Sequence, residues 1–132
     1  MALPVTVAHT GSLGGSPSTG SIGAPSLQEI LNTSWSATYG SSKSGRPSII
    51  NATDGSPFEL DLETITKVRV LVINVKAGSL VIKVTSAHGT EQEFGISNGN
   101  LILHMPAAGD ELTAIEFVGT ADIEYFLAGD VS

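Results

Sequence analysis

Three histidines and 13 acidic side chains are the residues of this 132-residue sequence that could support acid–base, nucleophilic or metal chemistry. His9 lies near the N-terminus, His88 lies in a Gly-flanked segment and His104 lies in an apolar run. Nucleophilic hydrolysis needs a serine, a histidine base and an acid that orients the histidine, and no Gly-x-Ser-x-Gly motif is present. A carboxylate pair within residues 110–124 is conceivable, but nothing marks one of these acids as buried. We therefore expect no catalytic residue and no enzyme activity.

Metal and cofactor sites have as little support in the sequence. His88 stands near Glu91 and Glu93 without the tight ligand spacing of a zinc motif, and the absence of cysteine excludes thiolate ligands. Three acids alternate along residues 58–63, but on one strand face they stand about 7 Å apart, too far for one ion to bridge all three. The Gly-rich segments near the N-terminus precede no lysine of a phosphate-binding loop. We expect no metal and no cofactor.

The net charge of −7 is unevenly distributed along the chain. Residues 1–56 are neutral overall, whereas residues 57–132 carry eleven acidic and four basic side chains. Nucleic-acid binding needs basic surface that displaces counterions from phosphates, so the acidic part argues against it. No apolar run approaches the roughly 18 residues of a membrane span, and the first residues lack the basic and apolar regions of a signal peptide. We expect neither a nucleic acid nor a membrane as a partner.

Residues 67–86, KVRVLVINVKAGSLVIKVTS, predict the element around which the chain is organised. Val68–Val75 and Leu80–Thr85 are rich in β-branched residues, which favour strands, and the polar break Lys76–Ser79 contains a glycine suited to a tight turn. We therefore predict a β-hairpin. The second run alternates between an apolar and a polar face, whereas the first is apolar on both faces. A strand of this kind is central in a sandwich or covered by a neighbouring subunit.

The remaining patterns predict an all-β fold of about eight short strands at roughly ten-residue spacing. No helix is long enough for a βαβ crossover, so we expect an antiparallel β-sandwich with a jelly-roll-like body, or a small barrel. The further predicted strands cover residues 48–52, 58–63, 90–96, 101–105, 112–118 and 122–128, and a turn at 119–121 separates the last two.

The sequence divides into an extended N-terminal arm, residues 1–46, and a β-sandwich body, residues 47–132. The arm is rich in Gly and Ser, and a capping box predicts one short helix near residues 27–33. Two interpretations of the arm stay open: a disordered leader, or a segment that becomes ordered on a neighbouring subunit. Trp35 and Tyr39 are anchors or a sugar-stacking platform. The candidate interface residues are Leu3, Val5, Val7, Leu13, Ile22, Trp35, Tyr39, Val70, Val72 and Ile73.

Four segments, residues 65–71, 78–86, 109–115 and 119–130, resemble in their strand and turn patterns the small virion accessory proteins of tailed bacteriophages. The resemblance implies a non-catalytic structural protein, a capsid decoration (cement) protein that binds the shell through its body and arm. It further implies the major capsid protein or other virion subunits as partners, a homo-oligomer with a trimer favoured, and a place on the particle surface after synthesis in the host cytoplasm. The alternatives are a tail, fibre or connector component, and a small carbohydrate-binding or adhesin-like module.

Overall fold

The computed structural model describes residues 5–9 and 35–131, and every regular element in these ranges is a β-strand. Contacts divide the chain into a small unit, Thr6–Thr38, and a larger unit that includes Tyr39–Ser132. The strand β1 (Val5–His9) pairs with β2 (Trp35–Tyr39), and all their residues except Val5 and Tyr39 belong to the small unit. The predicted helix at 27–33 lies outside the described residues. Within those ranges, the chain forms no helix with the length and apolarity of a membrane span.

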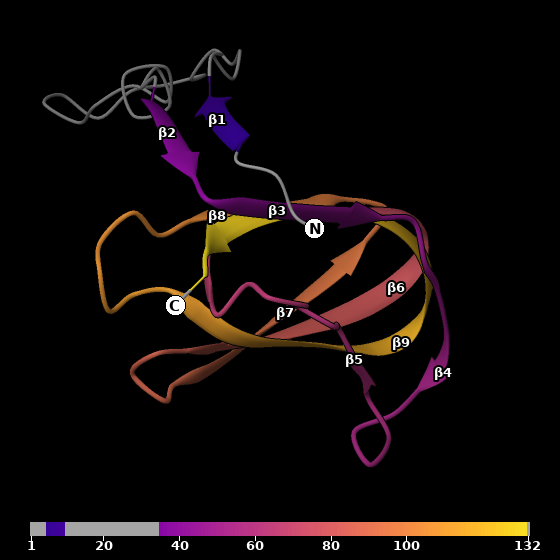
Figure 1. Ribbon diagram of the computed structural model, residues 1–132. Coiled ribbons are helices and arrows are strands. Elements are labelled where there is room, and N and C mark those ends of the chain that lie inside the picture. The colour runs from indigo at the N-terminus through magenta and orange to yellow at the C-terminus, as the bar shows by residue number, and fades with distance from the viewer. Residues whose placement is uncertain (1–4, 10–34, 132) are drawn as a thin grey trace, which may run out of the picture. The chain divides into compact units, whose positions relative to one another are not determined.

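The larger unit is one seven-stranded antiparallel sheet built on two long strands that lie side by side (Figure 1). This arrangement confirms the predicted all-β, antiparallel class. The long strands pair with each other, and five shorter strands pair with one or the other of them. The strands are β3 (Ser41–Gly45), β4 (Ser48–Ala52), β5 (Phe58–Glu59), β6 (Lys67–Ser86), β7 (Glu91–Ser97), β8 (Asn100–His104) and β9 (Leu112–Asp130).

The predicted hairpin within residues 67–86 is wrong. These residues form the single 20-residue strand β6, and the predicted turn at 119–121 likewise lies inside the 19-residue strand β9. The two polar breaks lie opposite each other in the ladder, because Gly78 pairs with Ala121 and Leu80 pairs with Gly119. Both strands bend at this level, and β6 and β9 stay paired on either side of it. Neither strand therefore turns back on itself to form a hairpin.

The bend depends on two glycines with positive φ, 84° at Gly78 and 125° at Gly119. A Cβ at Gly78 would lie 2.3 Å from the carbonyl oxygen of Thr120, and one at Gly119 would lie 2.6 Å from that of Ser79. Each glycine therefore permits both a backbone conformation that L-residues avoid and a close approach of the opposite strand. No other residue type meets both requirements.

The bend divides the sheet into two half-sheets. In one, β8 and β3 flank the first part of β6 and the last part of β9; in the other, β7, β4 and β5 flank the remaining parts. Leu71 and Ile73 of the first half-sheet belong to the same buried cluster as Ile82 and Phe117 of the second. The inner faces of the two half-sheets therefore cover one hydrophobic core.

The structure places the start of the body earlier than residue 47. Residues 41–45, assigned from the sequence to the arm, form β3 and pair with β9 from Gly129 to Tyr125. Their Ser, Lys and Gly composition hides this role, because edge pairing uses the backbone and requires no apolar side chain. The predicted strand at 58–63 is also shorter than expected, since only Phe58 and Glu59 pair with β9.

We expect Gly119→Ala to lower the free energy of unfolding by at least about 2 kcal/mol, because the new Cβ adds backbone strain and meets the Ser79 carbonyl. Gly95→Ala is the matched control, since a Cβ at Gly95 on β7 meets nothing within 4 Å. Urea unfolding followed by circular dichroism measures both. Equal stability of the two variants would contradict the role assigned to the bend.

Candidate docking site at the open edge of the sheet

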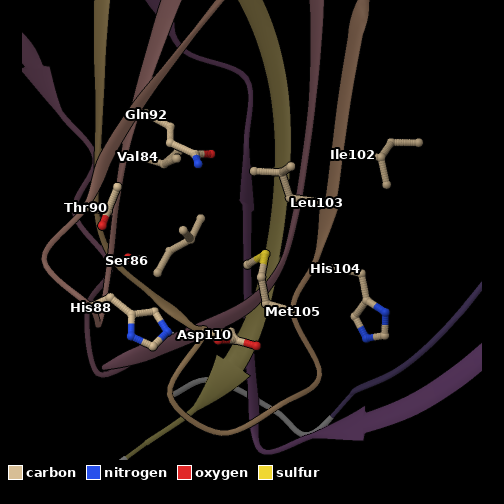
Figure 2. A pocket seen from close by; sticks show the side chains of 11 residues that line it. Val84, Ser86, His88, Thr90, Gln92, Ile102, Leu103, His104, Met105 and Asp110 are labelled. Carbon is tan, nitrogen blue, oxygen red and sulfur yellow. Dashed lines mark hydrogen bonds and ion pairs between the residues drawn. The ribbon is translucent and has the colours of Figure 1, made fainter.

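A hollow of about 580 Å³ lies between β7 and β8, and we call it the β7–β8 hollow. Its size falls within the roughly 300–1,000 Å³ typical of ligand sites. Figure 2 shows Gln92 and Val84 on one side, Leu103 and Ile102 on the other, and His88 toward one end. The complete lining is Val84, Ser86, His88, Thr90, Gln92, Ile102, Leu103, His104, Met105, Asp110 and Leu112.

The β8 edge of the hollow presents backbone groups that β6 does not use. The Met105 N–H donates to the Arg69 carbonyl (2.7 Å), and the Val75 N–H donates to the Gly99 carbonyl (2.8 Å). In an antiparallel ladder hydrogen-bonded and non-hydrogen-bonded pairs alternate. The intervening Val72–Ile102 pair is therefore non-hydrogen-bonded, and the N–H and C=O groups of Ile102 point away from β6.

The β7 edge has the same character. The Ser86 N–H donates to the Thr90 carbonyl (2.9 Å), so the next pair, Thr85 with Glu91, is non-hydrogen-bonded. The alternation directs the backbone groups of Glu91, Glu93 and Gly95 away from β6. Among the described strands, β7 and β8 each pair only with β6. The hollow thus lies between two unfilled edges of one sheet.

Two of the lining residues, His88 and Asp110, contact each other, with His88 Nε2 and Asp110 Oδ1 3.0 Å apart. Ser86 lines the same hollow, so the three residue types of a hydrolytic triad are close to one another. No hydrogen bond joins the Ser86 hydroxyl to His88, and both members of the His–Asp pair are more than half exposed. The cluster therefore lacks the nucleophile–base contact that acyl transfer uses.

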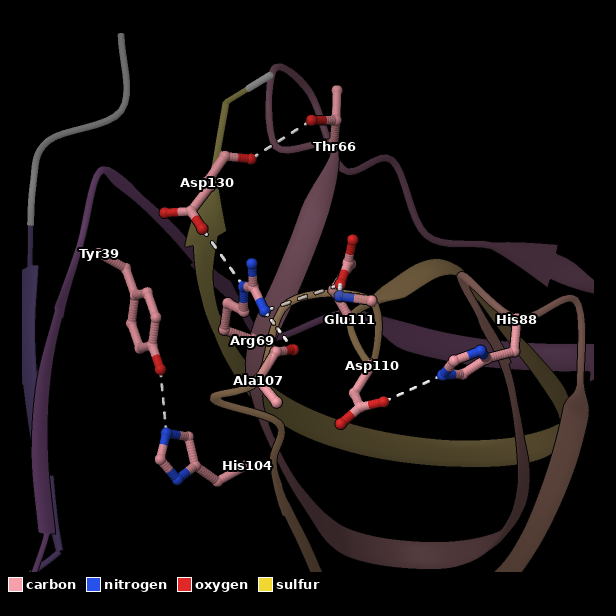
Figure 3. Close-up of polar contacts among 10 residues, drawn as sticks. Tyr39, Thr66, Arg69, His88, His104, Ala107, Asp110, Glu111 and Asp130 are labelled. Carbon is pink, nitrogen blue, oxygen red and sulfur yellow. Dashed lines mark hydrogen bonds and ion pairs between the residues drawn. The ribbon is translucent and has the colours of Figure 1, made fainter.

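The loop that carries Asp110 is fixed by Arg69, as Figure 3 shows. The Arg69 guanidinium donates from Nη1 to the Ala107 carbonyl (2.6 Å) and from Nε to Asp130 Oδ2 (3.2 Å). Its Nη1 also lies 3.7 Å from Glu111 Oε2. Arg69 and Glu111 are both buried. One guanidinium therefore ties the start of β6 to the end of β9 and to one wall of the hollow.

Glu111 also stabilises the loop from within. Its carboxylate accepts a hydrogen bond from the Gly109 N–H (2.7 Å). The hydrogen bond from its own backbone N–H is the largest influence that lowers the pKa of Glu111, and the Gly109 N–H, Arg69 and Lys67 act in the same direction, against desolvation. The carboxylate is therefore ionised at neutral pH, as its place beside Arg69 requires.

The side of the first half-sheet that faces away from the core carries a second candidate feature, which we call the outer apolar face: Val70, Val72, Ile102, Phe126 and Ala128. Val70 and Ala128 are fully buried, whereas Val72 and Phe126 are partly exposed. Val72 pairs with Ile102 on one side and with Phe126 on the other, and directly paired residues project from the same face. The neighbouring residues Leu71, Ile73 and Leu103 project inward to the core. Ile102 is 58% exposed and also lines the hollow, so the two features meet at this residue.

Tyr39 and His104 border the outer apolar face. The Tyr39 hydroxyl lies 2.9 Å from His104 Nε2, and the two rings meet edge to face. Burial lowers the pKa of His104 and is the main cause that raises the pKa of Tyr39. Both side chains are therefore neutral at pH 7, which suits a contact with apolar neighbours.

The ten sequence-predicted interface residues divide into three groups. Leu3, Leu13 and Ile22 lie outside the described residues. Val5 and Trp35 lie in β1 and β2, and Val7 is partly exposed in β1. The remaining four lie in the larger unit. Tyr39 is buried next to the outer apolar face, and Val70 is buried within that face. Val72 is a partly exposed member of the same face, and Ile73 is in the core.

Sequence reasoning missed Ile102, Phe126 and the edges of the hollow. Within the predicted strand at 101–105, Leu101 and Leu103 pack against the core, whereas Ile102 lies on the opposite, exposed face. That alternation was the available signal. No sequence signal located the hollow, because it arises where β7 and β8 diverge along the bent strand β6.

Within residues 5–9 and 35–131, no three histidine or acidic side chains are grouped as a metal site would require. Comparison with protein-family models and with curated proteins gives no match for this chain. The arguments about function therefore rest on the geometry of the hollow and the outer apolar face.

We expect Arg69→Met to lower the free energy of unfolding by about 2–3 kcal/mol. The cost falls below that of a fully buried ion pair because Asp130 is 41% exposed. Arg46→Met removes an ion pair to Glu124 whose arginine is 80% exposed, and should cost less than about 1 kcal/mol. Chemical denaturation of both variants measures the difference, and a smaller loss at Arg69 than at Arg46 would contradict the anchoring role.

Acid should weaken the contribution of Glu111. Because its pKa is lower in the folded chain than the ordinary 4.5, its stabilisation is complete above pH 4.5 and declines as the pH falls below that value. The gap in unfolding free energy between the wild type and Glu111→Gln should therefore narrow on acidification. Urea midpoints between about pH 3 and pH 7 test this. If this difference in unfolding free energy instead widened toward low pH, the predicted stabilising role of the ionised Glu111 carboxylate would be contradicted.

Proposed function

We propose that this protein is a non-catalytic structural subunit that acts by packing against other subunits, as a capsid decoration protein on the virion surface of a tailed phage. The observation that carries the proposal is the outer apolar face, which crosses three neighbouring strands, β8, β6 and β9. Ile102 is the exposed part of this face, with Val72 and Phe126 partly exposed beside it. Apolar side chains gathered at a surface are typical of a protein–protein interface. In this proposal the protein forms a homo-oligomer, with a trimer favoured, and contacts the major capsid protein or another virion subunit.

Two further points belong to this proposal, one about the fold of the larger unit and one about the charge of the whole chain. The two half-sheets share one core, and in this proposal they act as the layers of a β-sandwich; the jelly-roll-like form of that fold stays a prediction. The net charge of −7 suits a partner surface that is more basic. A tail, fibre or connector component would use the same face, so the position in the particle needs a separate measurement.

Self-association through the outer apolar face can be tested with Ile102→Asp. We expect this variant to stay folded, because Ile102 is 58% exposed, and to lose the mass of the oligomer in sedimentation equilibrium, because a carboxylate in an apolar interface is costly to desolvate. Ile50→Asp on β4 is the matched control, since Ile50 is 71% exposed and lies outside this face. An Ile102→Asp variant with unchanged oligomer mass would contradict the assignment of the face.

The place of the protein in a particle is measured by quantitative mass spectrometry of purified virions from the organism that encodes it. A simple ratio of its copies to those of the major shell protein is expected for a decoration protein. A few copies per particle would favour the tail or connector, and absence from particles would reject the virion proposal.

A further inference from the structure

We propose that the β7–β8 hollow accepts one extended segment of a partner protein, with alternating apolar and basic residues, which adds as a strand to the free edge of β7. The inference rests on the proposed function only in that an assembly supplies the partner chain. Strand addition obtains affinity from backbone hydrogen bonds and specificity from alternate side chains.

The edge of β7 offers the hydrogen bonds that an added strand needs. The backbone groups of Glu91, Glu93 and Gly95 point away from β6 at alternate positions, which matches the two-residue period of a strand. The hollow is continuous with this edge, since Thr90 and Gln92 form part of its lining. A segment placed there would extend the second half-sheet toward β8.

The inner side of the hollow is apolar. It is lined by Val84, Leu103, Met105 and Leu112. Val84 and Leu112 belong to the core cluster, and the other two pack against it. Every second side chain of an added strand would face this surface and extend the core. These positions of the partner segment should therefore be apolar.

The intervening side chains of the partner would meet carboxylates. Glu91 and Glu93 are exposed on β7, and the nearby Lys83 is already engaged by Asp54 and Glu93. The electrostatic cost of like charges argues against β7 of a second copy as the occupant, because edge-to-edge pairing would bring the glutamates of both copies onto one face. Basic residues at these positions of a partner segment would instead form favourable contacts with Glu91 and Glu93.

The test uses the full chain and a soluble probe, an acetylated and amidated hexapeptide of alternating Lys and Val. In two-dimensional NMR, we expect peptide-dependent shifts and slowed hydrogen exchange at the amides of Glu91, Glu93 and Gly95. A hexapeptide of alternating Glu and Val should bind at least about tenfold more weakly, because two unlike-charge contacts become like-charge contacts. A Lys–Val peptide N-methylated along its β7-facing edge should give no protection.

Substitutions at one position separate charge from backbone pairing. Glu91→Gln keeps the edge N–H and should weaken Lys–Val peptide binding about threefold, whereas Glu91→Pro removes the donor at the first residue of the strand and should weaken it further. Glu59→Gln, an exposed glutamate on β5, is the control and should bind as the wild type does.

Equal binding of the Lys–Val and N-methylated peptides, or shifts confined to residues outside β7 and β8, would overturn the inference. So would a complete absence of binding by the Lys–Val peptide. None of these outcomes depends on the oligomer mass of Ile102→Asp or on the copy number in particles. The docking inference and the proposed function can therefore fail independently.

Discussion

The close approach of β6 and β9 at Gly78 and Gly119 is the constraint on which the rest of the larger unit depends. At this level each glycine lies against a carbonyl of the opposite strand at a distance that no Cβ could tolerate. Both strands can therefore bend while their pairing continues. Without the bend, the inner faces of the half-sheets would not meet over one core, and β7 and β8 would not diverge along β6. The hollow and the core are two results of the same local geometry.

The positions of the strands could be predicted from the sequence much better than their connections. Alternation and β-branched content located the segments that became β4, β7, β8 and the two parts of both long strands. A polar break with a glycine has the same local signature in a hairpin turn and in a paired bend, so residues 76–79 and 119–121 were interpreted as turns. Only the register between two segments about 40 residues apart, Gly78 opposite Ala121, distinguishes these cases.

The candidate site was partly predictable for a related reason. Two apolar faces along Val68–Val75 predicted a central strand, and β6 is central in the sheet, between β9 on one side and β7 and β8 on the other. That a neighbouring subunit covers the outer face of this strand stays a prediction. The order of the strands decides which strands lie at the edges of the sheet and that Ile102 is exposed. This order depends on pairing between distant segments, so it cannot be read from local sequence patterns. β3 was missed because its pairing with β9 depends on backbone groups, and its Ser-rich composition resembles a linker.

The ladder between β6 and β9 also constrains how the chain can fold. Its paired residues are 26 positions apart in the sequence at Ser86 and Leu112, and 63 positions apart at Lys67 and Asp130. Loop-closure entropy makes the shorter connection less costly to form first, so the ladder should grow from the Ser86 end past the glycines toward Lys67. Most of these contacts are distant in sequence, which is typical of slow-folding topologies. On this order, Arg69 meets Asp130 among the last events, and that ion pair completes the folded structure without directing its formation.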